Sequence, residues 1–380
     1  ETQLKALSTG EGENAARASL WLARVYTRPA EKDYATAAEV LGRAVESFGA
    51  SSVINDLRFD FANALMARPE PDWKNSLSAL QQIQVDGTFS QLAEVLSQRA
   101  VCLQKLGDYE TSLAANGEFL ARHGEHPLAS EARFMRAENL FLLGRLQESR
   151  EAFEEFLTTE ENHPRRDSAT FRVAQIHHAG GLWEECLATA VPLFTSNPDG
   201  PLYAQLPFIV GDSLFRQEKW SEAVGPLQDF LATRVTTDTA QGLTVKAGPN
   251  VDLAITQLAV ACDRTDQKEK ALTHFRTITD HYPVPTSQLP LALSELGRLA
   301  YESGDRELAR KALERFVASD TAENEIFAKH APVQRPRVRY YLGWLDAEEG
   351  RHEAAAARFG EVIALDASHS LAPDAALQQG

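Results

Sequence analysis

The sequence is poor in cysteine, in long apolar runs and in basic residues, and each shortage excludes a class of protein. Three cysteines, an odd number, give no disulfide framework. Cys102, Cys186 and Cys262 fall on helix faces predicted to be buried, so we interpret them as small core residues. No run of about 18 apolar residues occurs that could span a bilayer. The formal net charge of −16 leaves no basic stripe for nucleic acid or an anionic membrane.

Motifs of catalysis and cofactor binding are also missing. The patterns G-x-x-x-x-G-K-S/T, G-x-S-x-G, H-E-x-x-H and C-x-x-C do not occur, which excludes the usual phosphate loop, nucleophile elbow and zinc sites. His123 and His126 flank Glu125 in a connector without a partnering cysteine pair, and His177 takes a position that we predict to be in the core. We therefore predict no catalytic residues, no metal and no cofactor, and a protein that is not an enzyme.

What the sequence does contain is a period of 37 residues. Short turn segments begin at Gly107, Gly144, Gly181 and Glu218, each 37 residues after the one before. A fixed period in this range predicts a solenoid, in which each unit stacks only on its neighbours. The third residue of the turn forms a column, here called the turn column, that extends in both directions with some changes of spacing. Its members are Tyr34, Trp73, Tyr109, Leu146, Trp183, Trp220, Lys268, Arg306 and His352.

Two columns of small residues accompany the turn column. Helices can cross at contact distance only where neither presents a bulky side chain, so these columns predict the crossing point of a helical hairpin. Nine residues before the turn column stand Ala64, Ala100, Ala137, Ala174, Gly211, Ala259, Gly297 and Gly343. Three residues after it stand Ala37, Ser76, Ser112, Ser149, Cys186, Ala223, Ala271, Ala309 and Ala355.

Apolar residues and prolines complete the unit. Because a helix does not readily continue through proline, the prolines predict the ends of the second helices. The apolar anchors, ten residues beyond the turn column, are Phe119, Phe156, Leu193, Phe230, Ile278, Phe316 and Val362. The prolines that follow them are Pro127, Pro164, Pro198 and Pro283.

A unit of helix, glycine turn, helix and proline-marked connector resembles the tetratricopeptide repeat, whose period of about 34 residues implies slightly longer connectors here. The stretch from His126 to Phe156 is similar to the repeats of bacterial envelope proteins such as outer-membrane assembly lipoproteins and Tol-Pal coordinators. This resemblance implies the bacterial periplasm or cell envelope rather than the cytoplasm. Arg99 and Arg136 depart from the family pattern, which usually has leucine at their position.

The pattern predicts an all-α fold, a right-handed α-solenoid of about nine hairpins interrupted by two insertions. The first is rich in Thr and Val, which favours either a small β-hairpin, with Asn250 capping the helix after it, or a plain surface loop. The end of the sequence resembles half of a tenth unit, so we expect the native protein to continue. The predicted segments are repeats one to six at 1–231, an insertion at 232–250, repeats seven and eight at 251–319, an insertion at 320–337, and repeat nine with the start of a tenth at 338–380.

The second insertion ends in a basic stretch that contains Arg335, Arg337 and Arg339. Three arginines in five positions suit an acidic peptide or a phosphate group. The alternative is that these side chains lie over apolar surface and keep only their charged ends in water.

The resemblance also implies a binding groove lined by the first helix of each hairpin. Its inward positions lie three before, one after and four after the first column of small residues. For units four to six these are Phe134, Phe171 and Phe208, then Glu138, Gln175 and Asp212, then Phe141, His178 and Phe215. Aromatic rings with acidic groups suit an apolar or Lys/Arg-containing peptide. The alternative is that these aromatic residues pack between units, and burial distinguishes the two.

The functional hypothesis is therefore a scaffold or adaptor that is not an enzyme and binds a protein or peptide in this groove. No asparagine occurs at the second inward position, which disfavours recognition of an acidic C-terminal tail. Assembly into a larger complex is compatible with the pattern. The alternatives are the repeat region of a larger enzyme or sensor, and a structural protein that assembles end to end.

Overall fold

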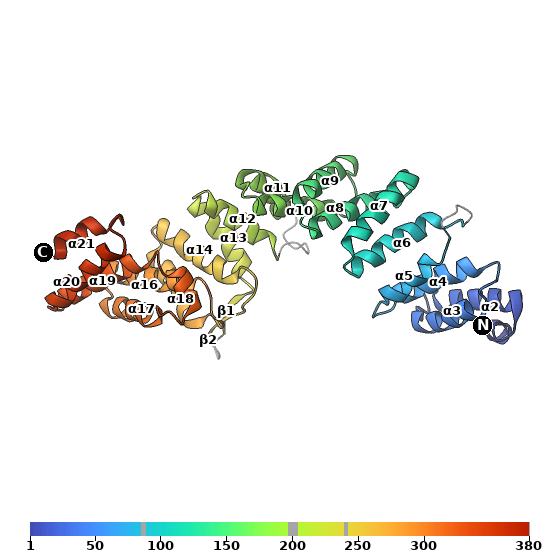
Figure 1. Ribbon diagram of the computed structural model, residues 1–380, viewed down its shortest axis with the longest axis horizontal. Helices are drawn as coiled ribbons and strands as arrows, with labels where there is room; N and C mark the ends of the chain where they lie inside the picture. The colour runs from blue at the N-terminus through green and yellow to red at the C-terminus, as the bar shows by residue number, and fades with distance from the viewer. Residues whose placement is uncertain (85–88, 197–203, 239–241, 380) are drawn as a thin grey trace. The chain divides into compact units, whose positions relative to one another are not determined.

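The computed structural model describes residues 1–84, 89–196, 204–238 and 242–379. Within these residues the helices follow one another as nine helical hairpins, and the two helices contact each other in every hairpin that lies within one unit (Figure 1). The prediction of an all-α fold built from repeated hairpins is confirmed. The chain divides into two compact units, Glu1–Ile176 and His177–Gly380. Among the described residues, no helix has the length and apolar character needed to cross a membrane.

Unit 1 contains four complete hairpins after a short leading helix. The first helices of its hairpins are α2, α4, α6 and α8, and the second helices are α3, α5, α7 and α9. Helix α10 begins a fifth hairpin and ends just inside unit 2. The bounds are α1 (Thr2–Ser8), α2 (Gly12–Tyr26), α3 (Tyr34–Ser47), α4 (Ile54–Met66), α5 (Trp73–Gln81), α6 (Leu92–Lys105), α7 (Tyr109–His123), α8 (Ala129–Leu142), α9 (Leu146–Thr159) and α10 (Arg166–Ala179).

Unit 2 contains the remaining hairpins, with α12, α14, α16 and α19 as first helices. A π-helical turn, η1, extends α15. The bounds are α11 (Trp183–Ser196), α12 (Leu206–Arg216), α13 (Trp220–Leu231), β1 (Val235–Asp238), β2 (Gly242–Val245), α14 (Val251–Arg264), α15 (Lys268–Arg276), η1 (Thr277–His281), α16 (Leu289–Glu302), α17 (Arg306–Ser319), α18 (Glu325–His330), α19 (Arg335–Glu348), α20 (His352–Leu365) and α21 (Ala372–Gln379).

The turn column marks where the second helices begin. Each of its nine members is the first residue of a second helix, from Tyr34 in α3 to His352 in α20. In four hairpins the residue before it is an aspartate whose carboxylate accepts a hydrogen bond from a backbone N–H in the first turn, as Asp108 does from Thr111 at 3.2 Å. Such a cap satisfies one of the N–H groups that have no partner within the helix.

The small-residue columns lie at the helix crossings, as predicted. A Cβ built onto Gly211 would lie 2.8 Å from Leu227 Cγ on the second helix of the same hairpin, so glycine is required for this approach. Two serines of the second column add hydrogen bonds across the crossing. Ser112 Oγ donates to the Ala100 carbonyl at 2.8 Å, and Ser149 Oγ donates to the Ala137 carbonyl at 2.9 Å.

The first insertion forms the small β-hairpin, in which β1 and β2 pair antiparallel from Val235 with Val245 to Asp238 with Gly242. Asn250 directly precedes α14, but its side chain makes no capping hydrogen bond and its backbone is left-handed, with φ of 63°. The predicted N-cap position of Asn250 is therefore confirmed, but the side-chain cap expected from an asparagine there is not formed. The second insertion contains a short helix, α18, that was not predicted, and α19 begins at Arg335, before the expected start of repeat nine.

The prolines behave in two ways. Pro127, Pro164 and Pro283 follow the ends of α7, α9 and η1, as predicted, and Pro198 lies outside the described residues. Pro192 and Pro226 instead lie inside α11 and α13, where each removes one backbone N–H donor. A proline in this sequence is therefore not always a helix boundary.

Candidate interaction surface on the first helices

The three phenylalanines of the first inward set are buried. Phe134, Phe171 and Phe208 expose 6%, 3% and 6% of their surface. Within unit 1, the ring of Phe134 lies 5.6 Å from that of Phe153 on the second helix of its hairpin. In unit 2, Phe208 lies 5.2 Å from Phe230 in the same arrangement. Burial favours the packing interpretation for these phenylalanines, and contact with a partner stays a prediction.

Three other predicted residues meet around one arginine in unit 1. Arg172 on α10 donates from Nε to Glu138 on α8 at 2.9 Å and from Nη1 to Gln175 at 2.8 Å. Its guanidinium carbon also lies 4.5 Å from the centre of the Phe141 ring. All four side chains are partly exposed. The structure therefore brings Glu138, Gln175 and Phe141 together through Arg172, which was not among the predicted site residues.

The pairing of Arg172 with Glu138 is one rung of a ladder that joins consecutive first helices, here called the first-helix ladder. Each rung in unit 1 connects residues 34 to 36 positions apart, which is close to one repeat period. Complementary polar residues at this spacing are the sequence signal that would have revealed it. The rungs are Arg24 with Asp60, Gln98 with Asn63, Gln104 with Asn139, and Arg172 with Glu138.

In unit 2 the ladder is centred on Asp212, which is almost fully buried. Its carboxylate accepts from His178 Nε2 at 2.7 Å, from Arg216 Nε at 3.2 Å and from Gln257 Nε2 on α14. Burial by itself raises the pKa of Asp212, but the hydrogen bonds from His178 and Gln257 and the charge of Arg216 outweigh it, so the net pKa is lowered. Asp212 is thus an ionised carboxylate that links α12 to its neighbours.

Partly exposed aromatic rings surround the Asp212 centre. The rings of His178 and Trp183 lie 5.4 Å apart, and the guanidinium carbon of Arg216 is 5.9 Å from the Trp183 ring. Phe215 meets Trp220 edge to face at 4.9 Å. The sequence reasoning treated the two tryptophans only as markers of helix starts. It therefore missed half of this aromatic surface.

The ladder continues along unit 2 through Arg298 on α16. Its guanidinium donates to Glu295 at 2.7 Å, to Glu302 at 2.9 Å and to Asp263 on α14. Burial lowers the pKa of Arg298, but the charges of Asp263 and Glu302 outweigh this, so the net pKa is raised. Glu295 also pairs with Arg337 on α19, which adds the next rung.

The basic stretch at the start of α19 is already paired within the chain. Arg335 binds both carboxylate oxygens of Asp320 at 2.8 Å, Arg337 pairs with Glu295, and Arg339 pairs with a glutamate of α20 at 2.8 Å. Each guanidinium therefore has a carboxylate of its own chain, which disfavours the interpretation of this stretch as an anion site.

The remaining candidates for chemistry are structural. No group of three His, Cys, Asp or Glu side chains in the described part of the chain is placed to hold a metal ion. His177 is buried, 3.5 Å from the Thr189 hydroxyl, as expected for a core histidine. All three cysteines are buried, and burial raises the pKa of Cys102 to about 12, so this thiol is not a reactive thiolate.

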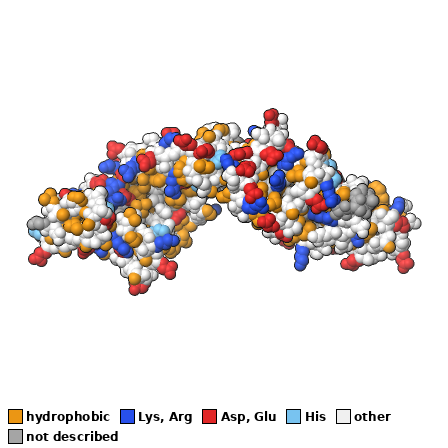
Figure 2. All heavy atoms as spheres, turned by 45° about the horizontal axis from the view of Figure 1, so that its top comes forward, with side chains coloured by type: hydrophobic (Ala, Val, Ile, Leu, Met, Phe, Trp, Pro, Cys, Tyr) orange, Lys and Arg blue, Asp and Glu red, His pale blue; other side chains and the backbone are white. Residues whose placement is uncertain are grey.

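Charges on the surface are mixed. On the face shown in Figure 2, acidic and basic side chains are interspersed, and neither sign forms a continuous stripe there. This distribution agrees with the many ion pairs between neighbouring helices. It gives that face no broad electrostatic attraction for a polyanion.

Comparisons with known proteins identify the repeat. A tetratricopeptide repeat family model matches residues 99–164 and 294–376. The C-terminal part of a TPR repeat-containing protein from Cytophaga hutchinsonii is similar in structure, with a TM-score of 0.50 and 13% identity over 73% of this chain and 98% of that one. A tetratricopeptide repeat protein from Parabacteroides merdae has a TM-score of 0.42 and 12% identity over 76% and 99%. No curated protein matches the chain. The matched stretches cover less than half of the chain, and together with the fold they support repeats of the tetratricopeptide type.

Proposed function

We propose that this chain is an adaptor or scaffold, not an enzyme, that binds a protein or peptide segment on the exposed side of its first helices. The observation that carries the proposal is the first-helix ladder. In unit 1 the arginine of one rung, Arg172, lies over the partly exposed Phe141, and in unit 2 the histidine of another rung, His178, contacts the partly exposed Trp183. A surface that is ordered before binding loses little conformational entropy when a partner docks.

The ligand chemistry follows from what the rings already contact. Arg172 lies over Phe141, and Arg216 lies near Trp183, so both rings suit a guanidinium group, and a partner would contact the part of each ring that stays exposed. The partly exposed rings of Phe215 and Trp220, which contact each other, offer further apolar area in unit 2. We therefore propose a partner segment that combines apolar side chains with Lys or Arg. The buried Phe134, Phe171 and Phe208 would support this surface from beneath.

Affinity capture from the native cell, followed by mass spectrometry, tests the proposal. The baits are the wild-type chain, a Phe141→Ala/Phe215→Ala variant, and a Val191→Ala control on the exposed side of the second helix α11. We expect a partner that the wild type and the control retain and that the double variant loses. A partner retained equally by all three baits would place binding elsewhere. A partner lost only together with helical circular dichroism would show that the double variant had unfolded.

Two finer statements belong to this proposal. Location in a bacterial periplasm or cell envelope is supported by the resemblance of residues 126–156 to envelope repeats. Assembly into a larger complex would follow if the two units bind different partners. Fractionation of the native cell, with a periplasmic and a cytoplasmic marker, tests the location, and recovery with the cytoplasmic marker would contradict it.

A further inference from the structure

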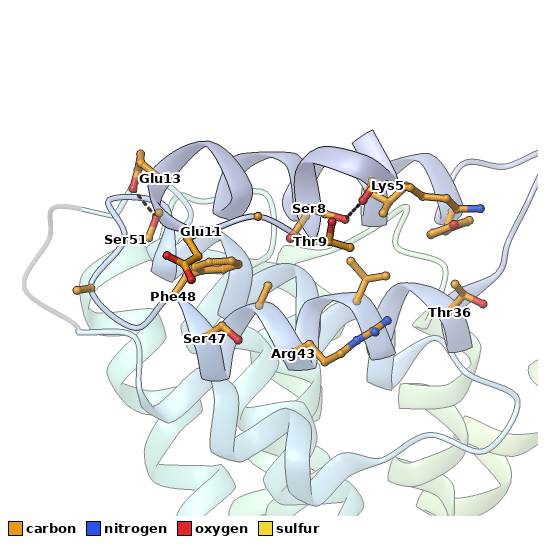
Figure 3. A pocket seen from close by; sticks show the side chains of 18 residues that line it. Lys5, Ser8, Thr9, Glu11, Glu13, Thr36, Arg43, Ser47, Phe48 and Ser51 are labelled. Atoms are coloured by element: carbon orange, nitrogen blue, oxygen red, sulfur yellow. Dashed lines mark hydrogen bonds between the residues drawn. The ribbon is translucent and has the colours of Figure 1, made fainter. Parts of the chain in front are cut away.

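Unit 1 contains a cavity that the first-helix surface does not use. It has a volume of about 1160 Å³ and lies between α1, α2 and the second helix α3 (Figure 3). Helix α1 contributes no buried residue, so it flanks the cavity without being packed into the core. The space is large enough for several side chains of a bound segment.

Helix α3 presents a distinct stripe to this cavity. Thr36, Val40, Arg43 and Ser47 line it and recur at intervals of four, three and four residues, which places them on one face of the helix. Ala37 and Leu41, which are fully buried, form the core-facing stripe of the same helix. The cavity stripe therefore lies beside the core-facing stripe, and of its members Val40 also packs against the core of the hairpin.

The floor of the cavity is apolar. Leu22 is buried beneath it, and Tyr26, Val40 and Phe48 are partly exposed along it. Partly exposed aromatic and aliphatic groups gain free energy when an apolar side chain covers them. Hydroxyl groups interrupt this floor, so it suits a peptide with mixed side chains better than a continuous hydrocarbon chain.

Charged groups give the cavity two different ends. Figure 3 shows Lys5 and Arg43 toward one end, with Glu11 and Glu13 toward the other. The carboxylate of Glu13 already has partners within the chain: it accepts hydrogen bonds from Ser51 Oγ at 2.7 Å and from the Ser52 backbone N–H at 3.2 Å. The two carboxylates at the acidic end repel a doubly charged phosphate more strongly than a singly charged carboxylate bound at the basic end.

Arg43 is the key group at the basic end. Within the described residues its guanidinium donates only to the Glu39 carbonyl at 3.3 Å and has no carboxylate partner. By contrast, Arg24 of the first-helix ladder pairs with Asp60 at 2.6 Å. A guanidinium keeps its charge at any pH of interest and presents several donors in one plane, which suits a carboxylate.

We propose that the cavity between α1 and α3 binds a peptide segment of a partner protein, with an Asp or Glu carboxylate on Arg43 and a neighbouring apolar side chain on Val40. A further part of the segment would reach Phe48, which lies beside Glu11 toward the other end. This site lies on the side of a second helix. It would bind an acidic segment, in contrast to the Lys/Arg-containing segment proposed for the first helices. The two sites can therefore be tested independently.

The experiment selects peptides from a random phage-displayed library on the complete 380-residue chain and measures the affinity of synthetic copies by fluorescence anisotropy. The variants are Arg43→Glu, which reverses the charge, and Val40→Trp, which fills the cavity. Arg28→Glu is the matched control. Arg28 is exposed and does not line the cavity, and its substitution changes the net charge by the same amount as Arg43→Glu. Circular dichroism confirms that each variant is folded.

We expect the selected peptides to be enriched in Asp or Glu next to an apolar residue. Arg43→Glu should weaken their binding by about tenfold or more, and Val40→Trp should weaken it as well. Arg28→Glu and the Phe141→Ala/Phe215→Ala variant should bind as the wild type does. Replacing the peptide's acid by its amide should weaken binding to the wild type but not further weaken binding to Arg43→Glu. Peptides without acid enrichment, equal effects of Arg43→Glu and Arg28→Glu, or no selected peptide would overturn the proposal.

Discussion

Phe359 on α20 packs directly against Gly343 on α19, so that a Cβ built onto the glycine would lie 2.8 Å from Phe359 Cε1. Phe359 is itself buried and belongs to the core cluster at this end of unit 2. The ring therefore has little room to move away, and the crossing of α19 with α20 depends on the missing side chain.

We expect Gly343→Ala to lower the free energy of unfolding by about 1–3 kcal/mol, because a methyl group would force the two helices apart. Urea denaturation followed by circular dichroism measures the change. Gly117→Ala is the matched control, since Gly117 lies inside α7 with open space around it. There the same substitution should raise the free energy of unfolding by about 0.5–1 kcal/mol. Equal effects at the two positions would contradict the role of the crossing.

A second prediction concerns the turn before α13. Glu218 has a φ of 59°, and the equivalent residues Gly107, Gly144 and Gly181 have φ values of 70° to 83°. Non-glycine residues are strained in this region because Cβ approaches the backbone. Glu218→Gly should therefore raise the free energy of unfolding by up to about 1 kcal/mol through relief of this strain. Glycine also increases the entropy of the unfolded chain, which reduces the gain.

Thermal denaturation of unit 2 measures the effect of Glu218→Gly. The control is Glu222→Gly, in the first turn of α13 itself. It should lower the free energy of unfolding, because glycine is a poor helix former. If both glycine substitutions were destabilising, backbone strain at Glu218 would not be significant.

The third prediction is a pH dependence that originates at Asp212. Its pKa in the folded chain is lower than its ordinary value of 3.8, so the unfolded chain takes up the proton more readily. The stabilisation by this group is therefore complete above about pH 4 and is lost as the pH falls through the folded pKa. Asp212→Asn should lower the free energy of unfolding at neutral pH by about 1–3 kcal/mol, because the hydrogen bonds lose a charged acceptor.

Urea denaturation at a series of pH values tests this third prediction. The difference between wild type and Asp212→Asn should shrink below about pH 4, where the wild-type carboxylate becomes protonated. Asp229, exposed on α13 and outside the ladder, provides the control substitution to Asn. A difference for Asp212→Asn that stayed constant down to pH 2 would show that its charge is unimportant.

The hairpins could be predicted from sequence because their determinants are local and recur. The turn column gave the starting residue of every second helix, from Tyr34 to His352, and the glycines and alanines of the first small column gave the crossings. The small side chain that a helix crossing requires is a property of one residue. It can therefore be recognised in the sequence without knowledge of the partner helix. Because the same residue types recur at a fixed spacing, a chance match at one position can be recognised by its absence from the other repeats.

The side-chain networks could not be predicted in this way. Arg99 occupies a position that usually has leucine. Its guanidinium donates at 2.7 Å to the carbonyl of Leu80, in the last turn of α5, and at 2.7 Å to that of Ile83, just after the helix. Asp212 was assigned to an open groove because it falls on an inward position implied by the family resemblance. Its burial depends on Gln257, which lies 45 residues away because the β-hairpin insertion intervenes. Such partners become apparent only when the helices are placed.

The first-helix ladder also bears on how a protein of this kind can change its length. Each rung belongs to two neighbouring hairpins, so a hairpin copied or deleted by recombination carries half of one rung on each side. Removing the hairpin that contains Asp212 would leave Gln257 without that acceptor, and moving it elsewhere would place a buried carboxylate against unselected neighbours. The packing within each hairpin would permit such exchange, since small residues form the helix crossing in every hairpin. The rungs restrict the exchange of hairpins, because each hairpin finds its polar partners only at its own position in the chain.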